Sequence, residues 1–216
     1  MIQMEKLFNE ETIAQVKQML QPMTKDVNFK VFTKEGAPSV VETVQLMTEF
    51  GENFDHINVD FLSIEEHTDL AEQYNVSLVP TIVALDSDNK DRGVRFVGVP
   101  LGHEINSLLA TTLELGQEAP ALPQDVIEKI KAIDKPTNIK VFVTLGCPHC
   151  PGAVHKAHQM AMLNDNIEAE MVEAQTFNEL SMKHNVSSVP HIVINDGKSF
   201  VGNQPIETFI NEANQA

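Results

Sequence analysis

The sequence predicts an α/β protein built from two tandem copies of one fold. Residues 185–193 read Asn-Val-Ser-Ser-Val-Pro-His-Ile-Val and echo residues 75–83, Asn-Val-Ser-Leu-Val-Pro-Thr-Ile-Val, at the 110-residue offset that separates Pro190 from Pro80. Within each copy, short apolar runs of strand length alternate with segments of helical periodicity, which is the order that β-α-β units produce. At 216 residues, the chain can form two compact domains of roughly 100 residues each.

The first part of each copy has a helix, a strand, a helix and a strand. The leading helix is predicted over residues 9–20 and 123–133, and the first strand over residues 28–33 and 138–144. The next helix shows apolar residues at helical spacing. These residues are Val40, Val44 and Met47 in the first copy, and Ala153, Val154, Ala157, Met160 and Ala161 in the second. The second strand is predicted over residues 57–61 and 167–172.

The remaining elements complete a βαβαββα order with an extra leading helix in each copy. A helix with Ser63 or Thr176 as its N-cap candidate leads to the Val-Pro strand, a hairpin and a closing helix. Parallel pairing in the strand-helix-strand unit and an antiparallel hairpin predict central mixed sheets flanked by helices. Gly116 and the prolines at 120 and 123 mark a linker, so we expect domains over residues 1–118 and 119–216.

The charge of the chain argues against two classes of partner, nucleic acids and anionic membrane surfaces. The formal net charge is −16, and most of it lies in the first copy, where residues 1–118 hold 8 basic and 20 acidic side chains. A nucleic-acid partner requires clustered Lys and Arg, and an anionic membrane surface attracts the same residues. We therefore expect neither partner, and we interpret the acidic residues as a solvated surface.

The N-terminal residues 1–10 contain no basic segment followed by a long apolar run, and no stretch of about 18 apolar residues occurs anywhere. These features predict a soluble, cytoplasmic protein. Because a structural disulfide does not persist in a reducing cytosol, the cysteines are expected to serve redox chemistry or metal binding.

The two cysteines of the chain form the motif Cys147-Pro148-His149-Cys150, between a predicted strand and a predicted helix. Two thiols at this spacing suggest a reversible dithiol/disulfide. The same offset places Ala37, Pro38, Ser39 and Val40 on these four positions in the first copy. The chain is therefore expected to have a single redox site.

A thiol at a helix start is expected to ionise readily, because free N–H groups and the helix dipole stabilise an anion there. We therefore predict that Cys147 is the attacking nucleophile, and that the more buried Cys150 resolves the mixed disulfide. His149, when protonated, would lower the pKa of Cys147 further and make the disulfide more oxidising.

This order of elements, with Cys-x-x-Cys at a strand-to-helix turn and a Val-Pro opening a later strand, resembles the thioredoxin fold, twice over the whole chain. Among tandem members, the chain resembles the glutaredoxin-like protein disulfide oxidoreductases and the N-terminal domain of the flavoprotein subunit of alkyl hydroperoxide reductase. The second resemblance is supported by the run Arg95-Phe96-Val97-Gly98-Val99-Pro100-Leu101-Gly102-His103-Glu104 and by the proline after Cys150. Ala37 and Val40 count against the disulfide oxidoreductases, which usually keep a Cys-x-x-Cys in each half.

The resemblance implies a site and a function. Pro190 is expected to be a cis proline that faces the dithiol, and Pro80 a cis proline with a structural role. Glu104 is expected near the redox centre, with a raised pKa that lets it accept a proton from the resolving thiol. The implied function is transfer of electrons from a flavin-dependent disulfide reductase to a protein disulfide, by resemblance that of a peroxiredoxin. No cofactor besides the Cys147–Cys150 disulfide is implied.

Two alternatives remain open. Cys-Pro-His-Cys also resembles the motif of strongly oxidising thiol oxidases, which allows a general disulfide oxidase or isomerase. Cys147, Cys150, His155 and His158 form a C-x2-C-x4-H-x2-H pattern, which allows a zinc-binding adaptor without catalysis. Both histidines would project down a helix away from its N-terminus, which argues against convergence with Cys147 and favours solvent-facing or interface positions.

Overall fold

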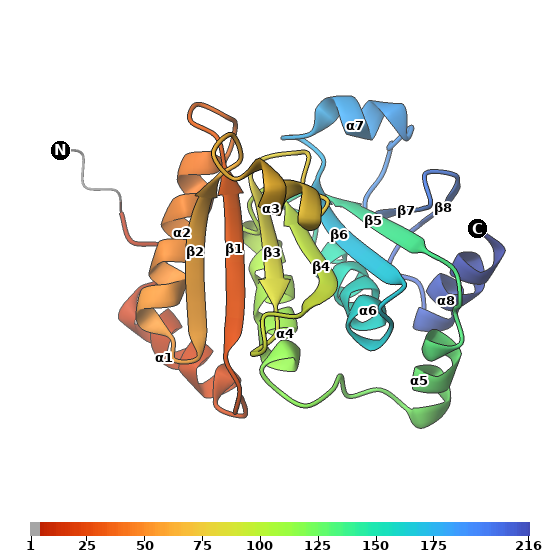
Figure 1. Cartoon of the computed structure of the whole chain (residues 1–216), viewed down its shortest axis with the longest axis horizontal. Helices are drawn as coiled ribbons and strands as arrows, with labels where there is room; N and C mark the ends of the chain where they lie inside the picture. The colour runs from red at the N-terminus through yellow and green to blue at the C-terminus, as the bar shows by residue number, and fades with distance from the viewer. Residues whose placement is uncertain (1–4) are drawn as a thin grey trace.

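A computed structural model describes residues 5–216 and contains a mixed sheet of eight strands in the order β2-β1-β3-β4-β6-β5-β7-β8 (Figure 1). The strands are β1 (Val27–Thr33), β2 (Ile57–Ser63), β3 (Thr81–Leu85), β4 (Asp91–Val97), β5 (Thr137–Val143), β6 (Ile167–Glu173), β7 (His191–Ile194) and β8 (Lys198–Val201). The helices are α1 (Glu10–Leu20), α2 (Val40–Asn53), α3 (Thr68–Gln73), α4 (Ile105–Leu115), α5 (Gln124–Lys131), α6 (Cys150–Leu163), α7 (Asn178–Lys183) and α8 (Ile206–Gln215), with a 3-10 turn η1 (Gly102–Glu104) before α4.

The predicted α/β fold is confirmed, including the extra helix that precedes each copy. In both copies the first two strands pair in parallel, and the hairpin continues the sheet with antiparallel pairing. The two expected sheets are joined, because β4 pairs in parallel with β6. The domain division after residue 118 stays a prediction, because the sheet and the largest core cluster both extend across it.

Side chains alternate between two apolar layers, as the period of a strand requires. In β5, Ile139, Val141 and Val143 belong to the core on one face of the sheet, and Phe142 belongs to a cluster on the other face. Helices α1, α2, α4, α5, α6 and α8 contribute to the first core. The short helices α3 and α7 cover the second face (Figure 1).

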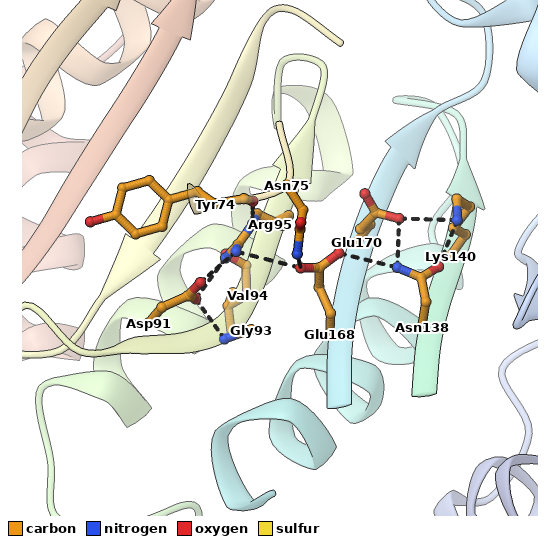
Figure 2. Close-up of polar contacts among 10 residues, drawn as sticks. All are labelled: Tyr74, Asn75, Asp91, Gly93, Val94, Arg95, Asn138, Lys140, Glu168 and Glu170. Carbon is orange, nitrogen blue, oxygen red and sulfur yellow. Dashed lines mark hydrogen bonds and ion pairs between the residues drawn. The ribbon is translucent and has the colours of Figure 1, made fainter. Parts of the chain in front are cut away.

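Polar side chains join the two copies along the β4–β6 junction (Figure 2). Arg95 is 2% exposed and donates to both carboxylate oxygens of Asp91, at 2.8 and 2.6 Å, and to the carbonyl of Tyr74 at 3.1 Å. It also lies 3.5 Å from Oε2 of Glu168 on β6. Gly93, at φ +75°, allows close approach at this junction, since a Cβ there would stand 2.2 Å from the carbonyl oxygen of Ile167.

Helix α4 of the first copy packs on α6 of the second. His158 on α6 is fully buried, donates from Nε2 to the carbonyl of Arg95 at 3.0 Å and accepts at Nδ1 from the hydroxyl of Thr111 at 2.9 Å. Burial lowers the pKa of His158 to about 3, so the ring is neutral. One turn earlier, His155 contacts Glu114 at 2.9 Å. The first copy thus fixes the helix that follows the cysteine motif.

The predicted N-caps Ser63 and Thr176 are wrong. Helices α3 and α7 begin at residues 68 and 178, after His67 and Phe177, and no side chain caps either one. The carbonyl of Ser63 accepts from the N–H groups of Glu66 and His67 in an intervening turn. The corresponding turn at Thr176 is stabilised by the carboxylate of Glu173, which accepts from two backbone N–H groups. Ser63 and Thr176 therefore belong to the turns that precede these helices and do not cap them.

Candidate active site

The motif cysteines form a disulfide in this structure. Cys147 and Cys150 are bonded, and their Cα atoms lie 5.5 Å apart. Cys147 is 8% exposed and Cys150 is fully buried, so the prediction that Cys150 is the more buried thiol is confirmed. Pro148 and His149 between them are exposed. Reaction partners therefore reach the disulfide from the side of Cys147.

One detail of the predicted site is wrong, because Cys147 does not begin the helix. Helix α6 begins at Cys150, and Cys147 lies in the turn that connects it to β5. Pro151 has no N–H group, so it cannot donate to the carbonyl of Cys147 and extend the helix backwards. Cys147 still lies within three residues of the helix N-terminus, so the lowered pKa of its thiol stays a prediction.

Both predicted cis prolines are confirmed. The Val79–Pro80 and Val189–Pro190 peptide bonds are cis, and both prolines are buried. Val189 is half-buried and packs on the same core cluster as the two cysteines. Within residues 5–216, no backbone hydrogen bond involves Val189. That its N–H and C=O groups pair with an extended segment of a partner stays a prediction.

Glu104 belongs to a turn that packs beside the cysteine motif. The N–H of His103 donates to the carbonyl of Leu145, two residues before Cys147, at 2.9 Å. Gly102, at φ +59°, permits this approach, because a Cβ there would stand 2.4 Å from the same oxygen. Glu104 is fully buried, and burial raises its pKa to about 7, although a hydrogen bond from Ser107 opposes the shift. Its role in catalysis stays a prediction.

The four residues of the alternative zinc pattern are not assembled in this structure. His155 pairs with Glu114, and both ring nitrogens of His158 are hydrogen-bonded to the first copy. Among residues 5–216, no group of three or more His, Cys, Asp or Glu side chains has the arrangement of a metal site. His158 occupies the interface position that the sequence allowed.

Sequence reasoning missed Ser107 beside Glu104, and two histidines that pack on the opposite face of the sheet from the cysteines. Ser107 donates to Glu104, and His184 and His191 lie against the ring of Phe142. Ser107 follows Glu104 by three residues, a spacing that brings side chains together on a helix, and this signal could have found it. No local signal marks the two histidines, because they come from different elements.

Comparison with known proteins agrees with this geometry. The profile of the thioredoxin domain family matches residues 137–215. The N-terminal (NTD_N/C) domain of the alkyl hydroperoxide reductase AhpF from Enterococcus faecalis superimposes with a TM-score of 0.90 at 28% sequence identity, over 94% of this chain and 98% of that domain. The chain resembles this N-terminal domain throughout. A protein disulfide oxidoreductase from Aeropyrum pernix superimposes with a TM-score of 0.87 at 28% identity, over 95% of this chain and 92% of that one.

Curated sequences show the same relation. The alkyl hydroperoxide reductase AhpF of Staphylococcus epidermidis is 29% identical over 194 residues, which cover 90% of this chain and 35% of the relative. AhpF of Staphylococcus aureus is 26% identical over 206 residues, or 95% of this chain and 38% of the relative. The chain therefore spans little more than a third of these relatives. Its fold, its disulfide and its relatives support thiol-disulfide oxidoreductase activity at a general level.

Among residues 5–216, no helix has the length and apolar character needed to cross a bilayer. The expected lack of an export signal concerns residues 1–10, of which residues 1–4 lie outside the described part of the chain.

Proposed function

We propose that this chain carries two electrons from a flavin-dependent disulfide reductase to a peroxiredoxin disulfide, as part of an alkyl hydroperoxide reductase system. The observation that supports this most strongly is a Cys-x-x-Cys disulfide in a tandem fold that matches the AhpF N-terminal domain along nearly its whole length. The name of the Enterococcus faecalis protein that contains the aligned domain describes it as an alkyl hydroperoxide reductase.

The proposed cycle begins when the reductase transfers two electrons and two protons to the disulfide. The thiolate of Cys147 attacks the peroxiredoxin disulfide and forms a mixed disulfide, releasing one peroxiredoxin thiolate. Cys150 loses its proton and attacks the sulfur of Cys147, which releases the second thiolate. The peroxiredoxin is then a dithiol, and the Cys147–Cys150 disulfide is restored. By resemblance, the backbone of Val189, which makes no backbone hydrogen bond within residues 5–216, would pair with the extended partner segment.

Reconstitution tests this function. The assay combines the chain with a thioredoxin-reductase-like flavoprotein, a peroxiredoxin, NADH or NADPH and an organic hydroperoxide, and follows oxidation of the nicotinamide. Cys147→Ser should abolish electron transfer, and Cys150→Ser should trap a mixed disulfide with the peroxiredoxin. Val40→Ser, at the position of the first copy that corresponds to Cys150, serves as the control and should retain activity. Full activity of Cys147→Ser would overturn the proposal.

A further inference from the structure

Glu104 and Ser107 form a buried polar pair at the start of α4. Oγ of Ser107 donates to Oε2 of Glu104 at 2.5 Å and lies 2.8 Å from the carbonyl oxygen of the same residue. Ser107 is 1% exposed. The other carboxyl oxygen of Glu104, Oε1, is buried and has no hydrogen-bond partner. A carboxyl group with one oxygen held and the other unpaired is a costly arrangement, which requires an explanation.

The hydroxyl of Ser107 has one hydrogen and two acceptors within reach. When Glu104 is ionised, the carboxylate is the stronger acceptor, because charge-assisted hydrogen bonds are stronger than neutral ones. When Glu104 is protonated, its carboxyl group is neutral and a weaker acceptor, and the hydroxyl of Ser107 can turn to the main-chain carbonyl oxygen. Ser107 therefore stabilises the ionised form more than the neutral form.

We propose that Ser107 is a positioning residue, which holds Oε2 of Glu104 so that the unpaired Oε1 exchanges a proton with the dithiol. This rests on the proposed function. In the resolving step, the S–H bond of Cys150 breaks and its proton passes to Oε1. The sulfur of Cys150 bonds to that of Cys147, and the partner sulfur leaves with the electron pair. The proton leaves Glu104 before the next cycle.

The surroundings of Glu104 favour this assignment. Its turn packs against the loop at Leu145 and against α6, and these two elements carry Cys147 and Cys150. The histidines on these segments, His103 and His149, are exposed. Other titratable groups on α4 and α6 are Glu114, His155, Lys156 and His158, and the first two of these pair with each other. Burial raises the pKa of Glu104, and the Ser107 hydrogen bond is the influence that lowers it.

The test compares Ser107→Ala with wild type by two readouts. Carbon-13 NMR of labelled glutamate carboxyls, assigned with Glu104→Gln, measures the pKa of Glu104 directly. The rate of alkylation of the reduced protein by iodoacetamide, from pH 5 to pH 9, reports the ionisation of the dithiol. Ser107→Ala should raise the pKa of Glu104 by about one pH unit, a tenfold change in its ionisation constant. The part of the alkylation profile that Glu104→Gln removes should also shift to higher pH in Ser107→Ala.

Controls separate this role from a structural one. Thr112→Val removes another buried α4 hydroxyl, which donates to Leu108 and not to Glu104, and should leave the titration unchanged. Ser107→Thr keeps the hydroxyl and should titrate as wild type. If Ser107→Ala does not fold, Ser107→Gly should give the same shift.

Several results would overturn the inference. An unchanged Glu104 titration in Ser107→Ala would do so, and so would an alkylation profile that Glu104→Gln leaves unaltered. Ser107→Ala can also be combined with Glu104→Gln. If it shifts the alkylation profile as much in that background as in wild type, its effect does not pass through Glu104. Loss of electron transfer to the peroxiredoxin alone would contradict the proposed function, since neither titration requires a partner protein.

Discussion

His184 and His191 are two imidazoles buried between α7 and the sheet. Both lie against the ring of Phe142, with ring centroids 5.5 and 6.4 Å away. His191 is 7% exposed, and neither of its ring nitrogens has a hydrogen-bond partner. His184 has its Nε2 3.4 Å from a carboxylate oxygen of Asp196. The 110-residue offset places Tyr74 and Thr81 at these positions in the first copy.

These histidines predict loss of stability in acid. Burial lowers the pKa of both. At His184 the carboxylate of Asp196 opposes this shift and the charges of Lys140 and Lys183 add to it, and at His191 the charge of His184 adds to it. A lowered pKa means that the folded state favours the neutral ring. The stability of the protein therefore falls as the pH drops below about 6.5, the pKa of histidine in the unfolded chain. The double variant His184→Tyr, His191→Thr should lose less stability than wild type between pH 7 and pH 5. Urea unfolding at both pH values measures this, and equal losses would contradict it.

The sequence predicted the residues whose chemistry is local. The pairing of Cys147 with Cys150 was predicted from a four-residue motif and agrees with the structure. The cis bond before Pro190 also agrees, but it was expected only from the resemblance. The burial of Glu104 agrees with an expectation taken from resemblance. The contacts of Ser107, His184 and His191 could not be predicted, because they depend on which elements meet in the folded chain.

At the scale of elements, α2 and α6 are equivalent helices in different environments. The outer face of α6 carries Val154, His155 and His158, and α4 of the first copy packs on it. The 110-residue offset places Val44, Gln45 and Thr48 on the same face of α2. Val44 is half-buried, and the neighbouring Val41 is 62% exposed.

This difference predicts unequal costs for one substitution at two equivalent sites. Val154 is fully buried, so Val154→Ala should cost about 2 kcal/mol of unfolding free energy through lost apolar burial and a cavity. Val44 is half-buried, so Val44→Ala should cost less than about 1 kcal/mol. Chemical denaturation of both variants measures the costs. Equal costs would mean that α4 does not shield α6 in solution.

The repeat offset predicted which elements exist and their order, because each copy repeats the same apolar periodicity. It could not predict where α3, α6 and α7 begin. The turns before α3 and α7 are closed by backbone and carboxylate contacts from Ser63 and Glu173, whose geometry depends on where the preceding strand ends.

At the scale of the whole molecule, Arg95 pairs with Asp91 in its own copy and contacts Glu168 in the other copy (Figure 2). Burial alone would raise the pKa of Asp91, but the hydrogen bonds and charge of Arg95 outweigh it and lower the pKa below 3.8. Arg95→Met would leave Asp91 and Glu168 without their buried cation. Removal of one partner of a buried ion pair typically costs about 3 kcal/mol or more.

We expect Arg95→Met to lose about 3 kcal/mol of unfolding free energy at pH 7. The deficit should shrink below about pH 4, where wild type loses the stability that comes from ionised Asp91. Arg92→Met is the matched control on the same strand. Arg92 is one-third exposed and pairs with Asp86, so its loss should cost less than about 1 kcal/mol. Equal effects of the two variants in equilibrium urea unfolding would contradict this account.

The strand edges at which the two sheets join could not be predicted from the sequence. The pairing of β4 with β6 brings Gly93 and Arg95 of the first copy against β6, which carries Glu168 and lies more than 70 residues later in the second copy. The composition and the repeat identify two units. They do not specify which edges meet.

The central claim is that the Cys147–Cys150 pair delivers electrons to a protein disulfide. The most direct test is the reduction potential of this pair, measured by equilibration with glutathione buffers and quantified by thiol alkylation. The proposed electron carrier should have a potential near or below about −230 mV, in the range of reducing thioredoxin-fold proteins. A potential near about −120 mV would place the pair among strong oxidants, favour the disulfide oxidase alternative and contradict the account.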